Sequence, residues 1–283
     1  MVVYKAEDDI KATGLGMRPE VKELRDIIVN RPMTASNDRK YPQLGWKALI
    51  GVIHPYGSPQ AGADFKKLAP PGVDAVIGWV PVHKNESTEE MMKLSDHVVE
   101  TAGSGIFRRS PEVVLWCCTA GSFLKGAGFD LQLVDGIKKA SGVQHATTTS
   151  TAIIAAFKEL GLKKIAMCTP YPRSANELEK KFIEAHGIEL TRCEGFEFVD
   201  FNDMQRAKPH DYYEFGRLCD TPDADGVFIS CTGIDVLEVI EPLEKTLGKP
   251  VITSNQASYW HAFKMARVGD PVAGYGTLMN RPR

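Results

Sequence analysis

The sequence predicts an α/β protein made of two pseudo-symmetric, duplicated domains, each a parallel sheet flanked by helices, with the active site in the cleft between them. Two observations support this prediction. Short β-branched runs alternate with amphipathic stretches from Trp46 onward, and the second half repeats landmarks of the first half in the same order. Strand alternating with helix is typical of parallel sheets with helical crossovers. The length of 283 residues fits two domains of ordinary size.

The expected strands are short and apolar, as buried parallel strands tend to be. In chain order they are Ala48–Ile53, Ala75–Val80, Val113–Cys118, Ile165–Cys168, Gly226–Ser230 and Val251–Thr253. The expected helices are the amphipathic stretches between and after these strands. They are Ser87–Ala102, Leu131–Ala140, Thr151–Leu160, Ser174–His186, Asp235–Leu247 and Ser258–Arg267.

The duplication is visible as paired segments at nearly constant spacing. IGVIHPY pairs with IAMCTPY, LWCCTAG with FISCTGI, and GVQHATTTSTAIIAAFK with GKPVITSNQASYWHAFK. Pro55 and Pro170 in the first pair are 115 residues apart, as are Gly72 and Gly187. We therefore expect a first domain of residues 46–148 joined by the returning segment 259–283, and a second domain of residues 149–258.

Residues 1–45 form an N-terminal extension outside this duplication. Within it, Pro19–Val29 has an apolar face at helical spacing, made by Val21, Leu24, Ile27 and Ile28. We expect this helix to have a structural role, covering either its own core or a neighbouring subunit of a homo-oligomer.

Composition and charge exclude several classes of protein. The hydrophobic fraction is 43%, the charged fraction is 25% and the net charge is −2, so a nucleic-acid partner is not expected. Apolar runs fall far short of the ~20 residues that a membrane helix needs, and charge at the N-terminus opposes a signal peptide, so we expect a cytoplasmic protein without a membrane partner. No glycine-rich segment has the context of a dinucleotide loop, and the six cysteines lack zinc-ligand spacing, so no cofactor or metal is expected.

The most informative motif is a Cys-Thr pair at the end of an apolar strand in each half, Cys118-Thr119 and Cys231-Thr232. Parallel sheets bind ligands at the carboxyl ends of their strands, so two facing sheets would direct both loops to one pocket. Backbone N–H groups in such turns lower thiol pKa values and hold anions, which favours a carboxylate substrate. The two thiols could act as base and acid, or one could add covalently to a double bond. The other four cysteines are most simply explained by packing.

The segments CTAGSFLKG, TTSTA, LGLKKIAMCTPY, SCTGIDVLEVIEPLEKTLGKPVITSNQASYWHA and GYGTLM carry a family resemblance. In them the chain resembles the aspartate/glutamate racemase superfamily, in the branch that contains maleate cis-trans isomerase, arylmalonate decarboxylase and the isomerase-like protein of ectoine utilisation. The resemblance implies a cofactor-independent enzyme in which Cys118 and Cys231 transfer protons or add covalently. Combining the motif and the resemblance, the candidate substrate-binding residues are Pro55, Tyr56, Thr119, Ser122, Tyr171, Asn176, Thr232 and Gly233.

Three functions remain open at this point. The leading hypothesis is an isomerase or racemase of a small carboxylic acid. A decarboxylase of disubstituted malonates, or a lyase acting through an enolate, is the nearest alternative, although retention of Cys118 argues against strict decarboxylation because arylmalonate decarboxylase lacks the first cysteine. The first loop, HPYGSPQAG, lacks the asparagine of maleate isomerase and argues against maleate itself. A non-catalytic carboxylate-binding protein is the third possibility. His54, on the same loop, is interpreted mainly as a structural histidine.

Overall fold

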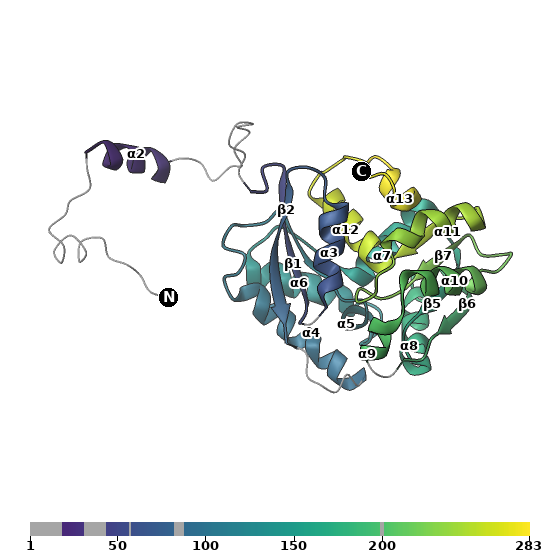
Figure 1. Ribbon diagram of the computed structural model, residues 1–283. Coiled ribbons are helices and arrows are strands. Elements are labelled where there is room, and N and C mark those ends of the chain that lie inside the picture. The colour runs from purple at the N-terminus through teal and green to yellow at the C-terminus, as the bar shows by residue number, and fades with distance from the viewer. Residues whose placement is uncertain (1–18, 31–43, 57, 82–87, 199–200) are drawn as a thin grey trace. The chain divides into compact units, whose positions relative to one another are not determined.

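The computed structural model describes residues 19–30, 44–56, 58–81, 88–198 and 201–283 (Figure 1). The chain divides into two compact units, residues 1–36 and residues 37–283. The described part of the first unit contains helix α2 (Pro19–Val29), which is the helix expected there. Both sheets belong to the second unit.

The second unit contains two four-stranded parallel sheets with the same topology. The first sheet has the order β2-β1-β3-β4 and consists of β1 (Ala48–Pro55), β2 (Val73–Val80), β3 (Val113–Trp116) and β4 (His145–Thr148). The second has the order β6-β5-β7-β8 and consists of β5 (Lys164–Thr169), β6 (Glu189–Gly195), β7 (Gly226–Ile229) and β8 (Val251–Thr253). The predicted α/β class with duplicated parallel sheets is confirmed. The exact domain boundaries, 46–148 with 259–283 and 149–258, stay predictions.

Helices follow the strands in both halves. They are α3 (Pro59–Leu68), α4 (Thr88–Gly103), α5 (Ala120–Phe123), α6 (Phe129–Ser141), α7 (Thr149–Leu160), α8 (Arg173–Glu184), α9 (Phe201–Arg206), α10 (Pro209–Cys219), α11 (Ile240–Leu247), α12 (Ser254–Met265) and α13 (Gly276–Asn280). The predicted helix at 235–247 begins instead as a 3₁₀ turn, Leu237–Val239. Ser87, where another helix was expected to start, lies outside the described residues. None of the described helices has the length and apolar character required to span a membrane.

Two expected strands end earlier than predicted. β3 ends at Trp116 rather than Cys118, and β7 ends at Ile229 rather than Ser230. Cys118 and Cys231 therefore lie two residues beyond the ends of β3 and β7, in turns at corresponding positions of the two sheets.

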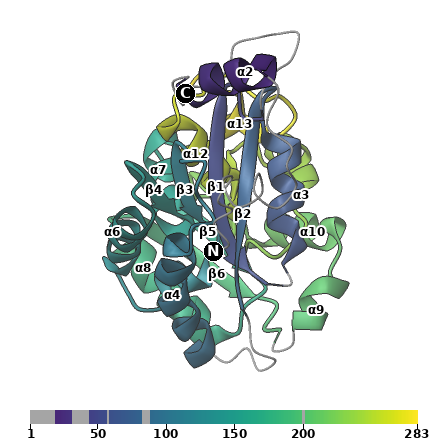
Figure 2. The ribbon, with the colours of Figure 1, turned by 90° about the vertical axis from the view of Figure 1, so that its left-hand side faces the viewer.

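Helices α7 and α12 pack against each other between the two sheets (Figure 1). Helix α12 also contacts α3 and the first-sheet strands β3 and β4. The ring of Phe65 on α3 meets the ring of Tyr259 on α12 edge-on, with centroids 5.4 Å apart. The other face of the first sheet is covered by α4 and α6 (Figure 2), with a separate apolar cluster that includes Leu94 and Val98. Burial of each such large apolar side chain stabilises the fold by about 1.5–3 kcal/mol.

Candidate active site

The first cysteine turn follows strand β3 directly. Cys118 is buried, and its Sγ accepts a hydrogen bond from the backbone N–H of Gly121 at 3.3 Å. A side chain at position 121 would bring a Cβ within 2.8 Å of the Trp116 ring and 3.1 Å of the Cys118 sulfur. Glycine is therefore required for the backbone N–H to approach the thiol this closely.

The second cysteine turn follows β7. It has a similar N–H to sulfur contact but a different backbone conformation. Cys231 is also buried, and its Sγ accepts the N–H of Gly233 at 3.3 Å. The φ angle of Cys231 is 142°, in a region that side chains with a Cβ rarely adopt. Such strain costs on the order of 1–3 kcal/mol and is typical of functional sites where surrounding contacts hold the backbone in place.

A single serine joins the two turns. The fully buried Oγ of Ser254, the first residue of α12, accepts a hydrogen bond from the Thr119 hydroxyl at 3.0 Å and another from the Cys231 backbone N–H at 3.0 Å. Thr119 follows the first cysteine, so the two turns, which come from different sheets, share one hydroxyl. Ser254 was not among the residues predicted from the sequence, although it lies in the repeated block TTST/TSNQ, whose run of hydroxyls was a usable signal.

Tyr171 lies beside both thiols. Its hydroxyl is hydrogen-bonded to the Cys231 thiol, and its ring is 6.3 Å from that of Phe123 on α5. Burial, followed by the proximity of Cys231, Glu179 and Cys118, raises the pKa of Tyr171 well above its usual value. The phenol therefore remains an O–H donor throughout the physiological pH range.

Asn176 holds the loop that carries Tyr171. Its side chain accepts a hydrogen bond from the Thr169 hydroxyl at 2.6 Å and donates one to the Tyr171 carbonyl at 3.3 Å. The Tyr171 N–H donates to the same Thr169 hydroxyl at 3.0 Å. A Cβ at Gly195, on the neighbouring strand, would collide with Asn176 and the Tyr171 carbonyl. The observed bonds of Asn176 are thus internal to this loop, and its direct contact with substrate stays a prediction.

Ser122 and Thr232 are engaged with the protein as well. The fully buried Ser122 hydroxyl lies 2.7 Å from both the Cys118 carbonyl and the Ser150 hydroxyl, so its bonds stabilise the first turn. The Thr232 carbonyl accepts a hydrogen bond from the Asn255 side chain at 3.0 Å, which stabilises the second turn. The substrate-binding roles expected for both residues remain predictions.

The first-loop candidates, Pro55 and Tyr56, have different surroundings. Pro55 is the last residue of β1, and Tyr56 is 69% exposed with its ring 5.9 Å from the ring of Trp79. The backbone N–H of Tyr56 donates to Val80, the last residue of β2. These contacts connect the loop to the end of β2 rather than to the bonds that join the two cysteine turns. Gly57 in this loop lies outside the described residues.

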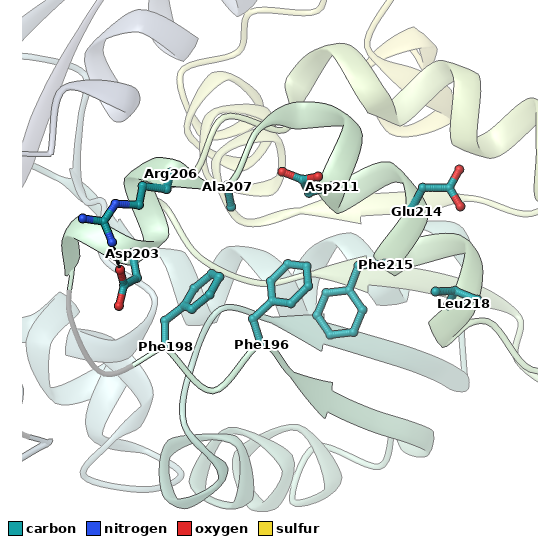
Figure 3. Close-up of a pocket in the computed structure, with 9 residues that line it drawn as sticks. All are labelled: Phe196, Phe198, Asp203, Arg206, Ala207, Asp211, Glu214, Phe215 and Leu218. Atoms are coloured by element: carbon teal, nitrogen blue, oxygen red, sulfur yellow. Dashed lines mark hydrogen bonds and ion pairs between the residues drawn. The ribbon is translucent and has the colours of Figure 1, made fainter.

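A separate hollow of about 490 Å³ opens beside β6, α9 and α10 (Figure 3). The rings of Phe196, Phe198 and Phe215 line it, with the carboxylates of Asp211 and Glu214 nearby. None of the predicted site residues lines this hollow. The candidate active site is therefore defined by the two cysteine turns, Ser254 and Tyr171.

The sequence is similar to known enzymes over most of its length. The family model for arylmalonate decarboxylase matches residues 83–279. The chain belongs to this family. The arylmalonate decarboxylase of Bordetella bronchiseptica is 29% identical over 226 residues, which cover 78% of this chain and 85% of the relative. The maleate isomerase of Geobacillus stearothermophilus is 24% identical over 198 residues, which cover 68% of this chain and 79% of the relative.

A solved structure confirms the fold relationship. A liganded double mutant of arylmalonate decarboxylase superposes with a TM-score of 0.75 at 28% identity, covering 82% of this chain and 98% of that chain. The predicted membership of the arylmalonate decarboxylase and maleate isomerase branch is thus confirmed.

Proposed function

We propose that the protein is a cofactor-independent isomerase or racemase of a small carboxylic acid, with Cys118 and Cys231 as the reacting thiols. The observation that carries this proposal is the junction of the two cysteine turns. Each thiol accepts one backbone N–H at 3.3 Å, and the Ser254 hydroxyl bonds both turns at 3.0 Å. The two turns that carry these thiols come from opposite halves of a duplicated fold and share one hydroxyl, which supports a common site for both cysteines.

In the racemase form of this reaction, one thiolate removes the proton from the carbon next to the carboxylate. The electron pair left on carbon delocalises into the carboxylate as an enolate, and the second thiol donates a proton to the opposite face. The first cysteine ends as a thiol and the second as a thiolate, so the protonation pattern of the pair is exchanged. Backbone N–H bonds to sulfur favour the thiolate form that this cycle needs.

In the isomerase form, one thiolate adds to an electron-poor carbon–carbon double bond while the other thiol protonates the adjacent carbon. The new carbon–carbon single bond rotates. Loss of that proton to the second cysteine and expulsion of the first thiolate then restore the double bond in the other geometry. Similarity to maleate isomerases supports this route as a variant of the same two-thiol chemistry.

Carboxylate binding would use donors beside the thiols. The Tyr171 hydroxyl keeps its proton and lies against Cys231, so it can stabilise negative charge that develops on the substrate. The Thr119 hydroxyl donates to Ser254 in this structure and would have to rotate to bind a carboxylate. The Thr232 hydroxyl would add a donor in the second turn. The Gly233 N–H donates to Cys231 Sγ in this structure and would have to be shared with a carboxylate.

Decarboxylation is the second candidate, and similarity to arylmalonate decarboxylase favours it. In that reaction the bond between the central carbon of a disubstituted malonate and one carboxylate breaks and releases CO₂. The resulting enolate takes its proton from one thiol. A lyase would pass through the same enolate, and a non-catalytic carboxylate-binding protein would perform none of these steps.

The test is incorporation of solvent deuterium, followed by NMR, across a panel of dicarboxylates, 2-arylpropionates and aryl-substituted malonates. We expect exchange at the carbon next to the carboxylate, with loss of optical purity. Cys118→Ala and Cys231→Ala should each lower the rate by about 10²–10⁴-fold, as loss of an acid or base does. Cys193→Ala, in β6 outside both turns, is the matched control and should retain activity.

The outcomes separate the candidates. A one-handed product formed from a malonate with release of CO₂ would favour the decarboxylase. If both cysteine variants exchange and convert every active substrate at the wild-type rate, the thiol mechanism is wrong. Binding without any conversion by the wild-type protein would favour the binding protein.

A further inference from the structure

Two buried carboxyl groups, Asp64 on α3 and Glu179 on α8, occupy corresponding positions in the two halves. They are 115 residues apart, the same spacing that separates Pro55 from Pro170. Their exposed fractions are 0% and 1%. Acidic side chains are rarely buried so completely without a specific partner, so this repeated placement calls for a physical role.

Glu179 contacts the residue that precedes the second cysteine. The Ser230 hydroxyl donates to Glu179 Oε1 at 2.6 Å, and Ser230 is followed directly by Cys231. The other oxygen, Oε2, is buried and has no hydrogen-bond partner among the described residues. Helix α8 also carries Asn176, which holds the Tyr171 loop. This helix therefore bonds both to Ser230, which precedes Cys231, and to the loop of Tyr171.

Asp64 reaches the residue that precedes the first cysteine through one intermediate. Asn255 donates to Asp64 Oδ2 at 2.6 Å, and its Oδ1 accepts the Cys117 thiol at 3.5 Å. The same Asn255 amide donates to the Thr232 carbonyl at 3.0 Å. Cys117 thus corresponds to Ser230, since each directly precedes the cysteine of its turn.

We propose that Asp64 and Glu179 are a matched pair of positioning residues, each holding the backbone that presents one reactive cysteine. This inference rests on the proposed two-thiol function and adds the groups that place the thiols. Asp64 acts on the first turn through Asn255 and Cys117. Glu179 acts on the second turn through Ser230.

The pair is chemically unequal, because Asp64 has hydrogen bonds on both oxygens and Glu179 has one on a single oxygen. Gln60 donates to Asp64 Oδ1 at 2.6 Å. Burial raises the pKa of Asp64 to about 7, and the bonds from Asn255 and Gln60 oppose that rise. Burial raises the pKa of Glu179 to about 8, opposed by the bond from Ser230. Burial thus moves the ionisation of both carboxyls from the acid range toward neutral pH.

The charged and titratable groups around each carboxyl define what its ionisation affects. Asp235 and Lys67 act on Asp64, and Asp64 in turn acts on Cys117 and Tyr259. Glu179 acts on Tyr171 in the β5–α8 loop and on Cys193 in β6. A negative charge on Glu179 thus forms next to the tyrosine that bonds Cys231, and this disfavours a second negative charge on that thiol.

The experiment measures thiol reactivity rather than turnover. The full-length protein is alkylated with iodoacetamide between pH 6 and pH 10, and the rates at Cys118 and Cys231 are resolved by peptide mass spectrometry. The variants are Glu179→Gln, which keeps an acceptor for Ser230 but cannot ionise, Glu179→Ala and Asp64→Ala. Glu177→Gln, an exposed position on the same helix, is the matched control.

We expect Glu179→Ala to change the Cys231 rate at pH 7 by about fivefold, the equivalent of one hydrogen bond, while the Cys118 rate stays within about twofold of the control. Glu179→Gln should keep the pH 7 rate and remove an ionisation near pH 8 from the Cys231 profile. Asp64→Ala should change the Cys118 rate, and also the Cys231 rate, because Asn255 contacts both turns.

Equal rates in Glu179→Ala and the control, in protein of native circular dichroism, would overturn the proposal for Glu179. If Glu179→Ala does not fold, an unchanged Cys231 profile in Glu179→Gln overturns it instead. An unchanged Cys118 rate in folded Asp64→Ala would overturn the pairing. These readouts do not depend on turnover, so a failure of the proposed function would appear separately, as absence of solvent exchange in wild-type protein.

Discussion

The two halves share one topology but differ at corresponding positions near the thiols. Tyr56 and Tyr171 are 115 residues apart, each directly after a repeated proline. Tyr56 is 69% exposed, whereas Tyr171 is 7% exposed and bonded to Cys231. The two halves therefore share the same fold, but only in the second half is the tyrosine buried where it can act as a proton donor.

The cysteine turns differ in backbone as well. Cys231 has a positive φ of 142°, and Cys118 is not among the described non-glycine residues with positive φ. The first turn runs into helix α5, and the second runs through Gly233 toward a 3₁₀ turn. The two thiols are thus presented by equivalent strands but by unequal turns, and this predicts unequal reactivity.

The tyrosine pair gives the largest expected effect. Tyr171→Phe removes an O–H donor at the site where negative charge would develop, and we expect kcat/KM to fall by about 10²–10³-fold. Tyr56→Phe should cause a much smaller fall, because the Tyr56 ring is largely exposed. Steady-state kinetics on any substrate found in the deuterium panel measure both variants. Equal losses in the two variants would remove the distinction between the halves.

His54 and Thr169 form the next pair, also 115 residues apart. Burial lowers the pKa of His54 to about 4, so the folded state binds fewer protons than the unfolded state between about pH 6.5 and pH 4. The stability that neutral His54 contributes to the fold is fully present above pH 6.5 and is lost as pH falls through this window. In His54→Thr, which copies the second half, we expect the loss of unfolding free energy between pH 7.5 and pH 4.5 to be smaller by about 2–3 kcal/mol. Urea unfolding at both pH values tests this, and identical losses would contradict it.

Ser254 and Thr149 begin the helices that follow the last strand of each sheet. Ser254→Ala leaves the buried Cys231 N–H without its acceptor, which should cost about 1–3 kcal/mol and also lower kcat/KM. Thr149 bonds the Trp116 carbonyl and the Ser258 hydroxyl, not the second turn, so Thr149→Ala should affect stability more than rate. Ser254→Thr, which keeps the hydroxyl, should recover activity. Thermal unfolding and steady-state kinetics of the three variants measure these effects. An unchanged kcat/KM in Ser254→Ala would show that the serine joining the two turns is dispensable.

The smallest effect concerns backbone strain. At Cys231, glycine relieves the positive φ, so Cys231→Gly should be more stable than Cys231→Ala by about 1 kcal/mol. At Cys118, where no such strain exists, Cys118→Gly should be less stable than Cys118→Ala. Chemical denaturation of the four variants measures this difference, and the same sign at both positions would count against strain at Cys231.

The sequence predicted the duplication and six of the strands because the apolar runs of these strands are unambiguous. It missed β4 and β6, which are edge strands of the two sheets. In β6, ELTRCEG, Leu190 is the one buried residue and the others are exposed or half-buried, and β4 is only HATT. β6 carries little apolar signal because much of it meets water, whereas β4 is buried beyond His145 but consists largely of threonine. The other two edge strands, β2 and β8, were predicted because their sequences are apolar.

At the candidate site, repetition of Cys-Thr was enough to select Cys118 and Cys231 from six cysteines. Ser254, Asp64 and Glu179 were not selected because their significance depends on hydrogen bonds between segments distant in the chain. Asp64 and Asn255, for example, are 191 residues apart and meet only after both halves have packed. A spacing of 115 between two acids was present in the sequence, but many pairs of acids share a spacing by chance.

The path of α12 has a consequence for how the chain is made. This helix leaves the second sheet after β8, yet it packs on α3, β3 and β4 of the first. The amino-terminal sheet therefore lacks part of its apolar covering until residues near 265 have left the ribosome. Contacts between such distant segments slow folding, and the unfinished sheet exposes apolar surface during synthesis. A nascent chain of this protein should therefore need protection from aggregation until α12 emerges.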